Sequence, residues 1–430
     1  MAVKTKRFIN SRKSCSCSMP GVWRAVAYCD GAVVIFHSPR ACSHVACSMD
    51  LGSHYRTLAE GQRERRETIP LLSSQLEEKH SIFGGAKLLK DCLDFAVSEY
   101  KPQCLVIANS CVAGVIGDDV EAVARAGEEQ HNLPVLTVDC YGFLDGEYYQ
   151  GYFEITQRLI ERFFVEQEPT PDTALLLGDN GGPWGSYSLE VRRLLGELGV
   201  KVIGQFPGYV PIGEMAELTR AQASIILGGY GQTGEGLEKI AAYLKKSYGL
   251  DYQLGVYPLG WRQTKEWITA MGRLFKKEKQ AEQLLAKEIS ALEQGMQRFL
   301  PITKDRKTVL CLGRWLMYFR PETVLETIAN LQLALQGIVL LDGYDTKERE
   351  AIIKNLDSCT AAPIYSYEQA DSLLAEAELI LTTHELKDKS LKQIFIPMLP
   401  KAGVTGELAF MEAIVRTLCS RLNRGGVTYV

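Results

Sequence analysis

The sequence contains no long apolar run. No stretch of its 430 residues approaches the ~20 consecutive apolar residues that span a bilayer. The N-terminal segment MAVKTKRFINSRKSCSCS is basic, but no apolar segment of the kind found in secretory signals follows it. These absences predict a protein with neither a membrane anchor nor a secretory signal, and the cytoplasm is the expected location.

The chain also has no excess of positive charge. Its 48 basic and 52 acidic side chains give a formal net charge of -4 and a pI of about 6.0. Proteins that bind nucleic acid usually carry a basic face or domain, so no nucleic-acid partner is expected. A P-loop of the GxxxxGK[ST] type is missing as well.

The pattern that does recur is a short apolar run, a glycine-rich or polar turn, and then a helical stretch. Strands that alternate with helices in this way are typical of parallel sheets that are buried on both faces. The sequence therefore predicts an α/β protein with Rossmann-like domains. The apolar runs are Cys104–Ala108, Val135–Val138, Ala174–Leu177, Val202–Phe206, Ser224–Leu227, Thr308–Leu312, Ile338–Leu341 and Leu379–Leu381.

The length predicts about three domains at roughly 150 residues each. A proline-containing linker is expected at Glu166–Thr173, and a long charged helix is expected from Lys276 to about Phe299. The resulting domains are residues 1–166, which contain all the cysteines of the N-terminal cluster described below, residues 167–300, which end in the long helix, and residues 301–430.

Cysteine is the most informative residue type. Of the twelve cysteines, Cys15, Cys17, Cys29, Cys42 and Cys47 lie in the first fifty residues. In a cytoplasmic chain, clustered cysteines indicate metal or redox chemistry rather than disulfides. Cys42 follows an apolar strand, AVVIF, and a further cysteine, at position 111, follows LVIANS and precedes a predicted helix. The helix dipole favours a thiolate at such a position.

The spacing of the cysteines excludes the common local metal motifs. No CxxC pair is followed by a second one, and Cys15 and Cys17 are too close together for the usual zinc loop. Bacterial ferredoxins take their ligands from neighbouring positions, which these cysteines do not occupy. Two interpretations remain from the pattern alone: a metal cluster held by the tertiary fold, or buried cysteines that only pack.

Several segments carry a resemblance to a known family. CSMPGVWRA, VVIFHSPRACSH, IANSCVAGVIGDD and VDCYGF resemble the cluster-binding half of the nitrogenase component 1 family. ALLLGDNGGPWGSYSLEVRRLLGELGVKVIGQFPG, KKSYGLDYQLGVYPLG and KAGVTGELAFMEAIVRTL resemble later elements of the same family, in the same order. The resemblance spans nearly the whole chain and implies three α/β domains of the nitrogenase component 1 type.

The resemblance implies a ligand set for an iron-sulfur cluster. Cys17, Cys42 and Cys111 match the cluster cysteines and would hold a [4Fe-4S] or a P-type [8Fe-7S] cluster at the interface with a partner subunit. Cys15 would be a rival or supplementary ligand, because it is two residues from Cys17. The other eight cysteines are expected mostly to pack; they are Cys29, Cys47, Cys92, Cys104, Cys140, Cys311, Cys359 and Cys419. His37, which precedes Cys42, would lie beside the ligands, or would simply bond the backbone as a loop histidine.

Asp118 and Asp119 follow Cys111 in the segment IGDD. The resemblance implies that both lie near the surface where an ATP-dependent iron protein docks. The alternative is ordinary capping, since aspartate is a common residue at a helix start.

The sequence departs from the family at the catalytic metallocluster. Nitrogenase alpha chains hold that cluster with a cysteine in the second domain and a histidine in the third. Here the strand ASIIL continues into GGYGQTGEG without a cysteine, and IFIPMLPKAGVTGEL lacks a histidine. His384, in TTHELKDKS, lies upstream and is a poor substitute. The chain is therefore expected to be a beta-like subunit, or to serve a reductase of another substrate, such as a tetrapyrrole or a sulfur compound.

Two further sites are candidates for a substrate cleft. The segment from Gly229 to Gly234 matches GxGxxG, but it does not follow the first strand of its domain and no acidic residue ends the next strand, so a dinucleotide is not favoured. Instead Gly228, Gly229 and Gly231 would let the backbone approach a substrate, or would form a plain tight turn. Arg314 resembles a basic loop of the family and would face an anionic cofactor or substrate, or solvent.

These observations predict a subunit of a nitrogenase-like, ATP-driven reductase. Its iron-sulfur cluster would relay electrons from an iron protein to a substrate or a second metallocluster, and its oligomeric partner would be a homologous component 1 subunit or a second copy. The leading alternative is a non-catalytic scaffold on which a nitrogenase-type metallocluster is assembled. A zinc or metal-free α/β protein is the third interpretation.

Overall fold

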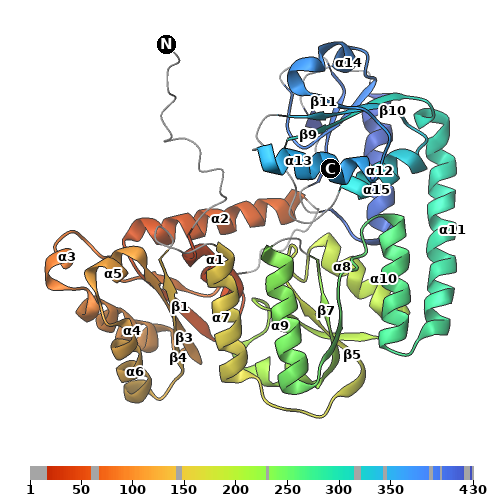
Figure 1. Cartoon of the computed structure of the whole chain (residues 1–430). Coiled ribbons are helices and arrows are strands. Elements are labelled where there is room, and N and C mark those ends of the chain that lie inside the picture. The colour runs from red at the N-terminus through yellow and green to blue at the C-terminus, as the bar shows by residue number, and fades with distance from the viewer. Residues whose placement is uncertain are drawn as a thin grey trace, which may run out of the picture. The chain divides into compact units, whose positions relative to one another are not determined.

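The structure is a computed structural model that describes residues 17–59, 67–141, 148–228, 232–313, 321–341, 346–386, 391–397, 400–420 and 427–428. These residues form three sheets with helices packed against them (Figure 1). The predicted α/β class is therefore confirmed. Each apolar run that was predicted as a strand lies in or overlaps one.

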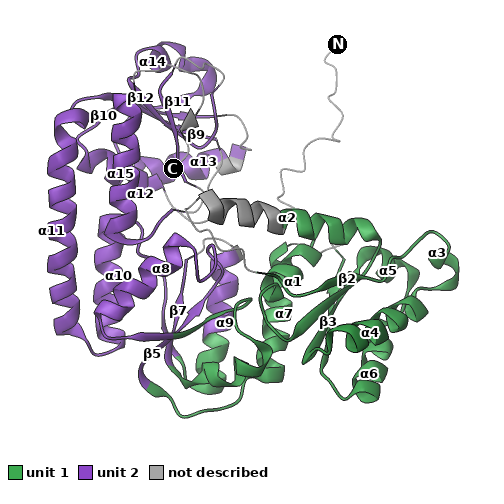
Figure 2. Cartoon of the chain, turned by 180° about the vertical axis from the view of Figure 1, so that it is seen from behind, with its two compact units in different colours: residues 1–170, 203–221, 242–250 green, residues 171–202, 222–241, 251–430 purple. Residues whose placement is uncertain are grey.

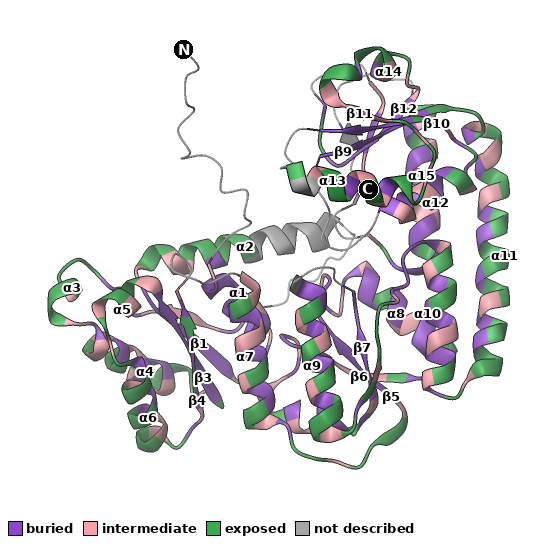
Figure 3. Cartoon of the chain, viewed as in Figure 1, coloured by how far each residue is buried: buried purple, intermediate pink, exposed green. Residues whose placement is uncertain are grey.

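The first sheet has the strand order β2-β1-β3-β4, and all its neighbouring pairs are parallel. Alternate residues of β1 and β3, including Val33, Ile35 and Ile107, pack with the buried faces of α4 and α6. Figure 3 shows that both central strands are buried along their length. The strands are β1 (Ala32–His37), β2 (Leu71–Ser73), β3 (Cys104–Ser110) and β4 (Val135–Cys140). The helices are α1 (Met19–Val26), α2 (Arg40–Ala59), α3 (His80–Phe83), α4 (Ala86–Tyr100), α5 (Cys111–Ile116), α6 (Val120–His131) and α7 (Tyr148–Phe163).

Helices α1 and α7 cross at two glycines. A Cβ atom on Gly21 would lie 1.9 Å from the backbone oxygen of Tyr148, and one on Gly151 would lie 2.4 Å from the backbone oxygen of Ser18. Only glycine permits backbones to approach this closely. The crossing fixes the start of α1, and therefore the segment that contains Cys17.

The second sheet has the strand order β6-β5-β7-β8. Its strands are β5 (Thr170–Leu177), β6 (Lys201–Phe206), β7 (Ala221–Ile226) and β8 (Asp251–Gln253), and its helical segments are α8 (Ser186–Glu197), the 3-10 helix η2 (Ile212–Arg220), α9 (Gln232–Tyr248), α10 (Gly260–Leu274) and α11 (Glu278–Thr303). The linker predicted at Glu166–Thr173 is wrong in its second half, because β5 begins at Thr170. The long helix also continues past its predicted end and includes Pro301.

The third sheet has six parallel strands in the order β11-β10-β9-β12-β13-β14. Its strands are β9 (Lys307–Leu312), β10 (Ala334–Leu340), β11 (Ile364–Ser366), β12 (Leu379–Thr382), β13 (Gln393–Phe395) and β14 (Val427–Thr428). The accompanying helical segments are α12 (Pro321–Asn330), α13 (Thr346–Asp357), η3 (Tyr367–Gln369), α14 (Asp371–Ala375) and α15 (Gly403–Cys419). If these strands are numbered along the chain with β9 as the first, their order is 3-2-1-4-5-6, which is the order of a doubly wound nucleotide-binding sheet.

The contacts within the chain divide it into two compact units (Figure 2). One contains residues 1–170, 203–221 and 242–250, and the other contains residues 171–202, 222–241 and 251–430. The division into domains at 1–166, 167–300 and 301–430 stays a prediction. Among the helices that the structure describes, none has both the length and the apolar character needed to cross a bilayer.

Candidate functional site

The candidate cluster site lies where the strand order of the first sheet reverses. After β1 the chain forms β2 on one side of that strand, and it later forms β3 and β4 on the other side. The carboxyl ends of β1 and β3 therefore flank the point where the strand order reverses. Ligands of doubly wound proteins bind at such switch points. Cys42 comes five residues after the end of β1, and Cys111 comes directly after β3.

Each of the three predicted ligands lies at the start of a helix. Cys17 precedes Ser18, which is the N-cap residue of α1. Cys42 is in the first turn of α2, where its N–H donates to the carbonyl oxygen of Pro39 at 3.1 Å. Cys111 is the first residue of α5, and Ser110 caps that helix by accepting from the N–H of Ala113 at 3.2 Å. All three cysteines are half-buried.

Electrostatic coupling shows which of these thiols are neighbours. Burial raises the pKa of the Cys42 thiol, a hydrogen bond from the Ser38 side chain lowers it, and nearby Cys111 raises it. Burial likewise raises the pKa of Cys140 well above its ordinary value, and Cys17 and Cys111 both add to that increase. The structure thus gathers four thiols at one end of the first sheet, although Cys140 was expected only to pack.

Cys140 packs in the core, as expected, since it ends β4 and is 1% exposed. The sequence did not show that it packs beside the predicted ligands, although it closes an apolar run as Cys111 does and lies in the segment VDCYGF. Because burial strongly disfavours its thiolate, Cys140 fits a protonated residue beside the ligands better than it fits a ligand.

The donor set fits an iron-sulfur cluster better than a single ion. Among the residues that the structure describes, no three histidine, cysteine or acidic side chains converge closely enough to hold one metal ion. In an iron-sulfur cluster the thiolates bind different irons, so their sulfur atoms stand farther apart than around one zinc ion. Three half-buried thiols at a switch point suit such a cluster, in which they would leave coordination positions for a partner chain.

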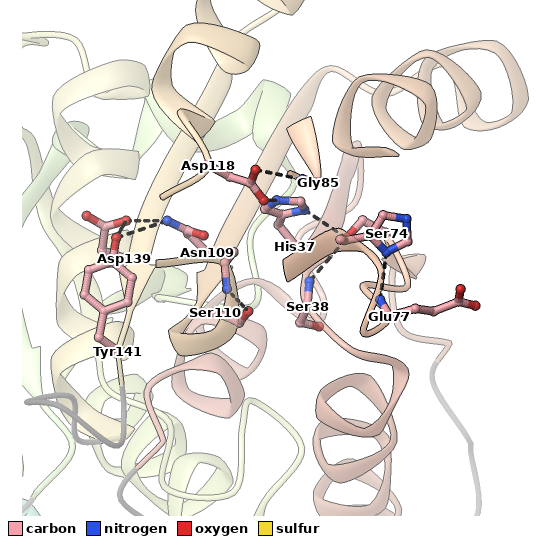
Figure 4. A network of polar contacts seen from close by, with 12 residues as sticks. His37, Ser38, Ser74, Glu77, Gly85, Asn109, Ser110, Asp118, Asp139 and Tyr141 are labelled. Atoms are coloured by element: carbon pink, nitrogen blue, oxygen red, sulfur yellow. Dashed lines mark hydrogen bonds and ion pairs between the residues drawn. The ribbon is translucent and has the colours of Figure 1, made fainter. Parts of the chain in front are cut away.

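A buried network joins the two loops that follow β1 and β3 (Figure 4). His37 Nε2 lies 3.0 Å from Asp118 Oδ2, and its Nδ1 lies 2.9 Å from Ser74 Oγ. The other carboxylate oxygen of Asp118 accepts from the N–H of Gly85 at 2.7 Å. Burial lowers the pKa of His37, and the hydrogen bond and charge of Asp118 oppose that effect. His37 therefore forms hydrogen bonds with side chains on two other segments. It is not a loop histidine that simply bonds the backbone, which was the alternative prediction.

The adjacent aspartates have different roles. Asp119 caps α6, because its Oδ1 accepts from the N–H of Ala122 at 2.9 Å, which confirms the capping interpretation for this residue. Asp118 does not cap a helix but holds His37. The expectation that both lie on a docking surface stays a prediction.

A second polar cluster flanks the cysteines at the ends of β3 and β4 (Figure 4). The side-chain amide of Asn109 donates to Asp139 at 2.9 Å and to the hydroxyl of Tyr141 at 3.2 Å. Tyr141 also donates to Asp139 at 3.0 Å. Burial, followed by the bond to Asp139, raises the pKa of Tyr141 to about 12. The phenol therefore stays protonated, and the cluster orients the residue pair that precedes Cys111.

The remaining predicted site residues are only partly within the described chain. Cys15, Gly229, Gly231 and Arg314 lie outside the described residues. Gly228 is buried at the end of β7 with a φ of 111°, a backbone conformation that favours glycine. Its role in a substrate cleft stays a prediction.

The cysteines that were expected only to pack differ in burial. Burial raises the pKa of Cys29 and of Cys311 to about 12 in each case, as packing predicts. Cys47, Cys359 and Cys419 are exposed, so the packing interpretation is wrong for these three.

Exposed apolar side chains continue from the cysteines along α2. Val45 and Met49 are 47% and 43% exposed, and they lie three and seven positions after Cys42. Residues at this spacing share one face of a helix. The half-buried Cys42 therefore lies in line with an exposed apolar stripe.

A second exposed apolar group lies on α3 and α5, which contact each other. It consists of Ile82, Phe83, Val112 and Val115, of which Phe83 is 83% exposed. Exposed apolar patches on a protein surface usually mark a site where another molecule binds.

Comparison with known proteins supports the resemblance. Residues 17–357 match the family model described as nitrogenase component 1 type oxidoreductase. The nitrogenase iron-molybdenum cofactor biosynthesis protein NifE of Clostridium pasteurianum is 26% identical over 307 residues, which are 67% of this chain and 63% of that protein. The nitrogenase molybdenum-iron protein alpha chain of Methanosarcina barkeri is 22% identical over 249 residues, covering 56% of this chain and 45% of that one. The chain thus matches less than two thirds of either relative.

Solved structures agree in fold. The structure titled "Nitrogenase Cp1 at pH 6.5" superposes with a TM-score of 0.65 at 16% identity, over 94% of this chain and 88% of that one. A second structure of the same protein at pH 5 gives the same TM-score. At this level of identity the likeness establishes the fold.

Proposed function

Because the chain belongs to the nitrogenase component 1 type oxidoreductase family, we propose that it is the cluster-carrying subunit of a nitrogenase-like, ATP-driven reductase. Cys17, Cys42 and Cys111 hold an iron-sulfur cluster, of the [4Fe-4S] or the [8Fe-7S] type. What supports this proposal is that Cys42 and Cys111 follow the two strands that flank the switch point of the first sheet and that Cys111 acts on the charge of Cys42, while Cys17 and Cys111 both act on that of Cys140. We place this chemistry in the cytoplasm, where the ATP-hydrolysing partner finds its substrate.

The bound cluster supplies one-electron transfer, and the protein residues hold and shield it. The contact between His37 and Asp118 ties the end of β1, before Cys42, to the segment that follows the helix of Cys111. Cys17 is presented by α1, whose start is fixed by the crossing with α7. Buried Cys140, 1% exposed, closes one side of the site against water.

A homologous component 1 subunit, or a second copy of this chain, is the proposed partner beside the cluster. Three thiols are too few for all the irons of either cluster type, so the remaining ligands come from elsewhere. The apolar stripe of Val45 and Met49 beside Cys42 supports this assignment, because a partner that completes the cluster would cover it.

The proposed electron donor is an ATP-dependent iron protein. This chain contains no P-loop motif, and we therefore assign ATP hydrolysis to the donor protein. The apolar group on α3 and α5 supports the assignment. It includes Val112, which follows the proposed ligand Cys111 directly, so a donor bound there would approach the cluster closely.

The cluster is tested by anaerobic purification followed by iron and acid-labile sulfide analysis. We expect coloured protein with near-equal amounts of iron and sulfide. Cys111→Ala should lose most of the iron and the visible absorption. Cys47→Ala is the matched control, since Cys47 is exposed on the same helix as Cys42, and it should retain both. Iron at trace level in the wild-type protein, or an unchanged spectrum in Cys111→Ala, would refute the assignment.

A scaffold for metallocluster assembly is the second candidate. The relatives named for cofactor biosynthesis favour it. A scaffold should transfer a metallocluster to an apo-enzyme without turnover. A reductase should oxidise its iron protein catalytically in the presence of ATP, and this assay separates the two.

A further inference from the structure

Tyr141 lies at the same edge of the first sheet as the proposed ligand Cys111. In the register of the two strands, Ser110 of β3 pairs with Cys140 of β4. Cys111 and Tyr141 are the residues that follow directly after this pair. Because β3 and β4 are parallel neighbours, both residues lie at the carboxyl edge of the sheet, which is where open α/β sheets bind their ligands.

The ring of Tyr141 packs against the backbone of α5 at Gly114. A Cβ atom on Gly114 would lie 2.4 Å from Tyr141 Cε1 and 2.9 Å from both Cδ1 and Cζ, so any side chain at position 114 would displace the ring. Gly114 is within one turn of Cys111, so a shift of the helix at Gly114 also moves Cys111. Ala113 is the only buried residue of this short helix, and the contact with the ring is therefore a large part of what fixes α5.

The hydroxyl end of Tyr141 orients the ring (Figure 4). It donates to Asp139 at 3.0 Å and accepts from the side-chain amide of Asn109 at 3.2 Å. Asn109 also donates to Asp139 at 2.9 Å, so its amide keeps a partner without the phenol. Asp139 is exposed, and water can replace the phenol there. The contact between the ring and Gly114 has no such substitute.

We propose that Tyr141 is a positioning residue for Cys111, whose ring fixes the first turn of α5 and thereby the place of the Cys111 thiol. The inference rests on the proposed function for what Cys111 binds. The position of the thiol, however, is a property of the chain itself, because every contact named above joins residues of this chain. It can therefore be measured in metal-free protein.

The test is alkylation of the full, reduced and metal-free chain by iodoacetamide, with the initial rate at each cysteine measured by mass spectrometry. Cys42 is the internal reference, because it is half-buried at the start of a different helix. Cys104 begins the same strand that ends before Cys111 and is 0% exposed, so its rate reports opening of the whole sheet. The rate at Cys111 relative to these two measures the local position of its thiol.

Four variants decide which contact acts. Gly114→Ala displaces the ring and Tyr141→Leu removes it, so each should raise the rate at Cys111 relative to Cys42 by about threefold or more. Tyr141→Phe keeps the ring and should restore the rate to within about twofold of the wild type. Val115→Ala alters a side chain that is 77% exposed on the same helix, and should change nothing.

The inference is overturned if Cys111 reacts at the wild-type rate in Gly114→Ala and Tyr141→Leu, or if Tyr141→Phe reacts as fast as Tyr141→Leu. It is also overturned if Cys42 and Cys104 accelerate as much as Cys111, since Tyr141 would then stabilise the whole sheet rather than position one thiol. Iron and sulfide analysis of anaerobically purified protein tests the proposed function separately. Wild-type protein without iron would refute the cluster and leave the alkylation result unchanged.

Discussion

His37 Nε2 and Asp118 Oδ2 lie 3.0 Å apart, and their side chains are 0% and 4% exposed. The pair connects the end of β1, five residues before Cys42, to the loop seven residues after Cys111. Because the second oxygen of Asp118 also accepts from Gly85, the carboxylate holds three segments of the first unit. The segments that precede Cys42 and follow Cys111 are therefore held together by one side chain.

Asp118→Asn should destabilise the protein and loosen the cluster site. The amide retains one acceptor oxygen for two donors, so a buried N–H loses its partner, at a cost of about 1–3 kcal/mol. Urea unfolding measures this loss, and iron content after anaerobic purification measures the effect on the site. Asp119→Asn is the matched control, since asparagine caps a helix as well as aspartate does. Equal behaviour of the two variants would contradict the role of Asp118.

Gly151→Ala should displace the segment that contains Cys17. The added methyl group would lie 2.4 Å from the backbone oxygen of Ser18, so α1 and α7 must separate. We expect loss of stability by at least 1 kcal/mol, in the range of about 1–3 kcal/mol for overpacking, together with lower iron content. In Gly196→Ala the new Cβ atom meets nothing within 4 Å, so that variant should be as stable as the wild type or slightly more stable. Normal iron content in Gly151→Ala would show that the crossing does not position Cys17.

Arg193→Ala should be strongly destabilising. The guanidinium donates to Glu190 at 2.7 Å and to Glu288 at 2.8 Å, and these carboxylates are only 8% and 5% exposed. Without the arginine, both buried carboxylates lose their positively charged partner, which lowers the free energy of unfolding by about 3 kcal/mol. Arg220→Ala, which breaks an exposed ion pair with Glu217, should change the unfolding free energy by less than about 1 kcal/mol. Similar urea midpoints for the two variants would refute this difference.

Glu407→Gln should remove a pH dependence of stability. Burial raises the pKa of Glu407 from its ordinary value of 4.5 to about 7, and Thr327 opposes this by donating to its carboxylate at 2.8 Å. Between these two values the folded chain keeps a proton that the unfolded chain has lost. The contribution of Glu407 to the free energy of unfolding is therefore fully present below pH 4.5. It falls by about 3 kcal/mol in total as the pH rises to about 7.

Glutamine mimics the protonated carboxyl group. The stability difference between wild type and Glu407→Gln, measured by urea unfolding from pH 4.5 to 7.5, should move in favour of the variant as the pH rises. A constant difference across that range would mean that Glu407 titrates normally.

Val45→Glu combined with Met49→Glu should prevent association with the proposed partner subunit. Both side chains are exposed on the face of α2 that includes Cys42, and a charge buried in an interface is costly. Sedimentation of the wild-type protein with its partner should show a complex that the variant does not form. Ile289→Glu on α11, at a residue that is 39% exposed, should leave the complex intact. If the double variant associates normally, the partner does not cover this stripe.

The sequence by itself determined the α/β class and the positions of the longer strands, because both follow from local apolar periodicity and from turn residues close in the chain. It also indicated Cys42 and Cys111 as site residues, since a residue at the end of a buried parallel strand must lie at the edge of the sheet. The short strands β2, β11, β13 and β14 were not predicted, because three residues or fewer carry too little pattern.

Only the tertiary structure decided which of these residues meet. The local sequence does not distinguish Asp118 from Asp119. In the fold Asp119 caps a helix, whereas Asp118 bonds to His37, which lies 81 positions earlier in the chain. It likewise brought Cys140 close to two of the proposed ligands, Cys17 and Cys111. Strand order is set by long-range packing that no local window contains, so the sequence determined the elements and the tertiary structure determined the switch points where their ends meet.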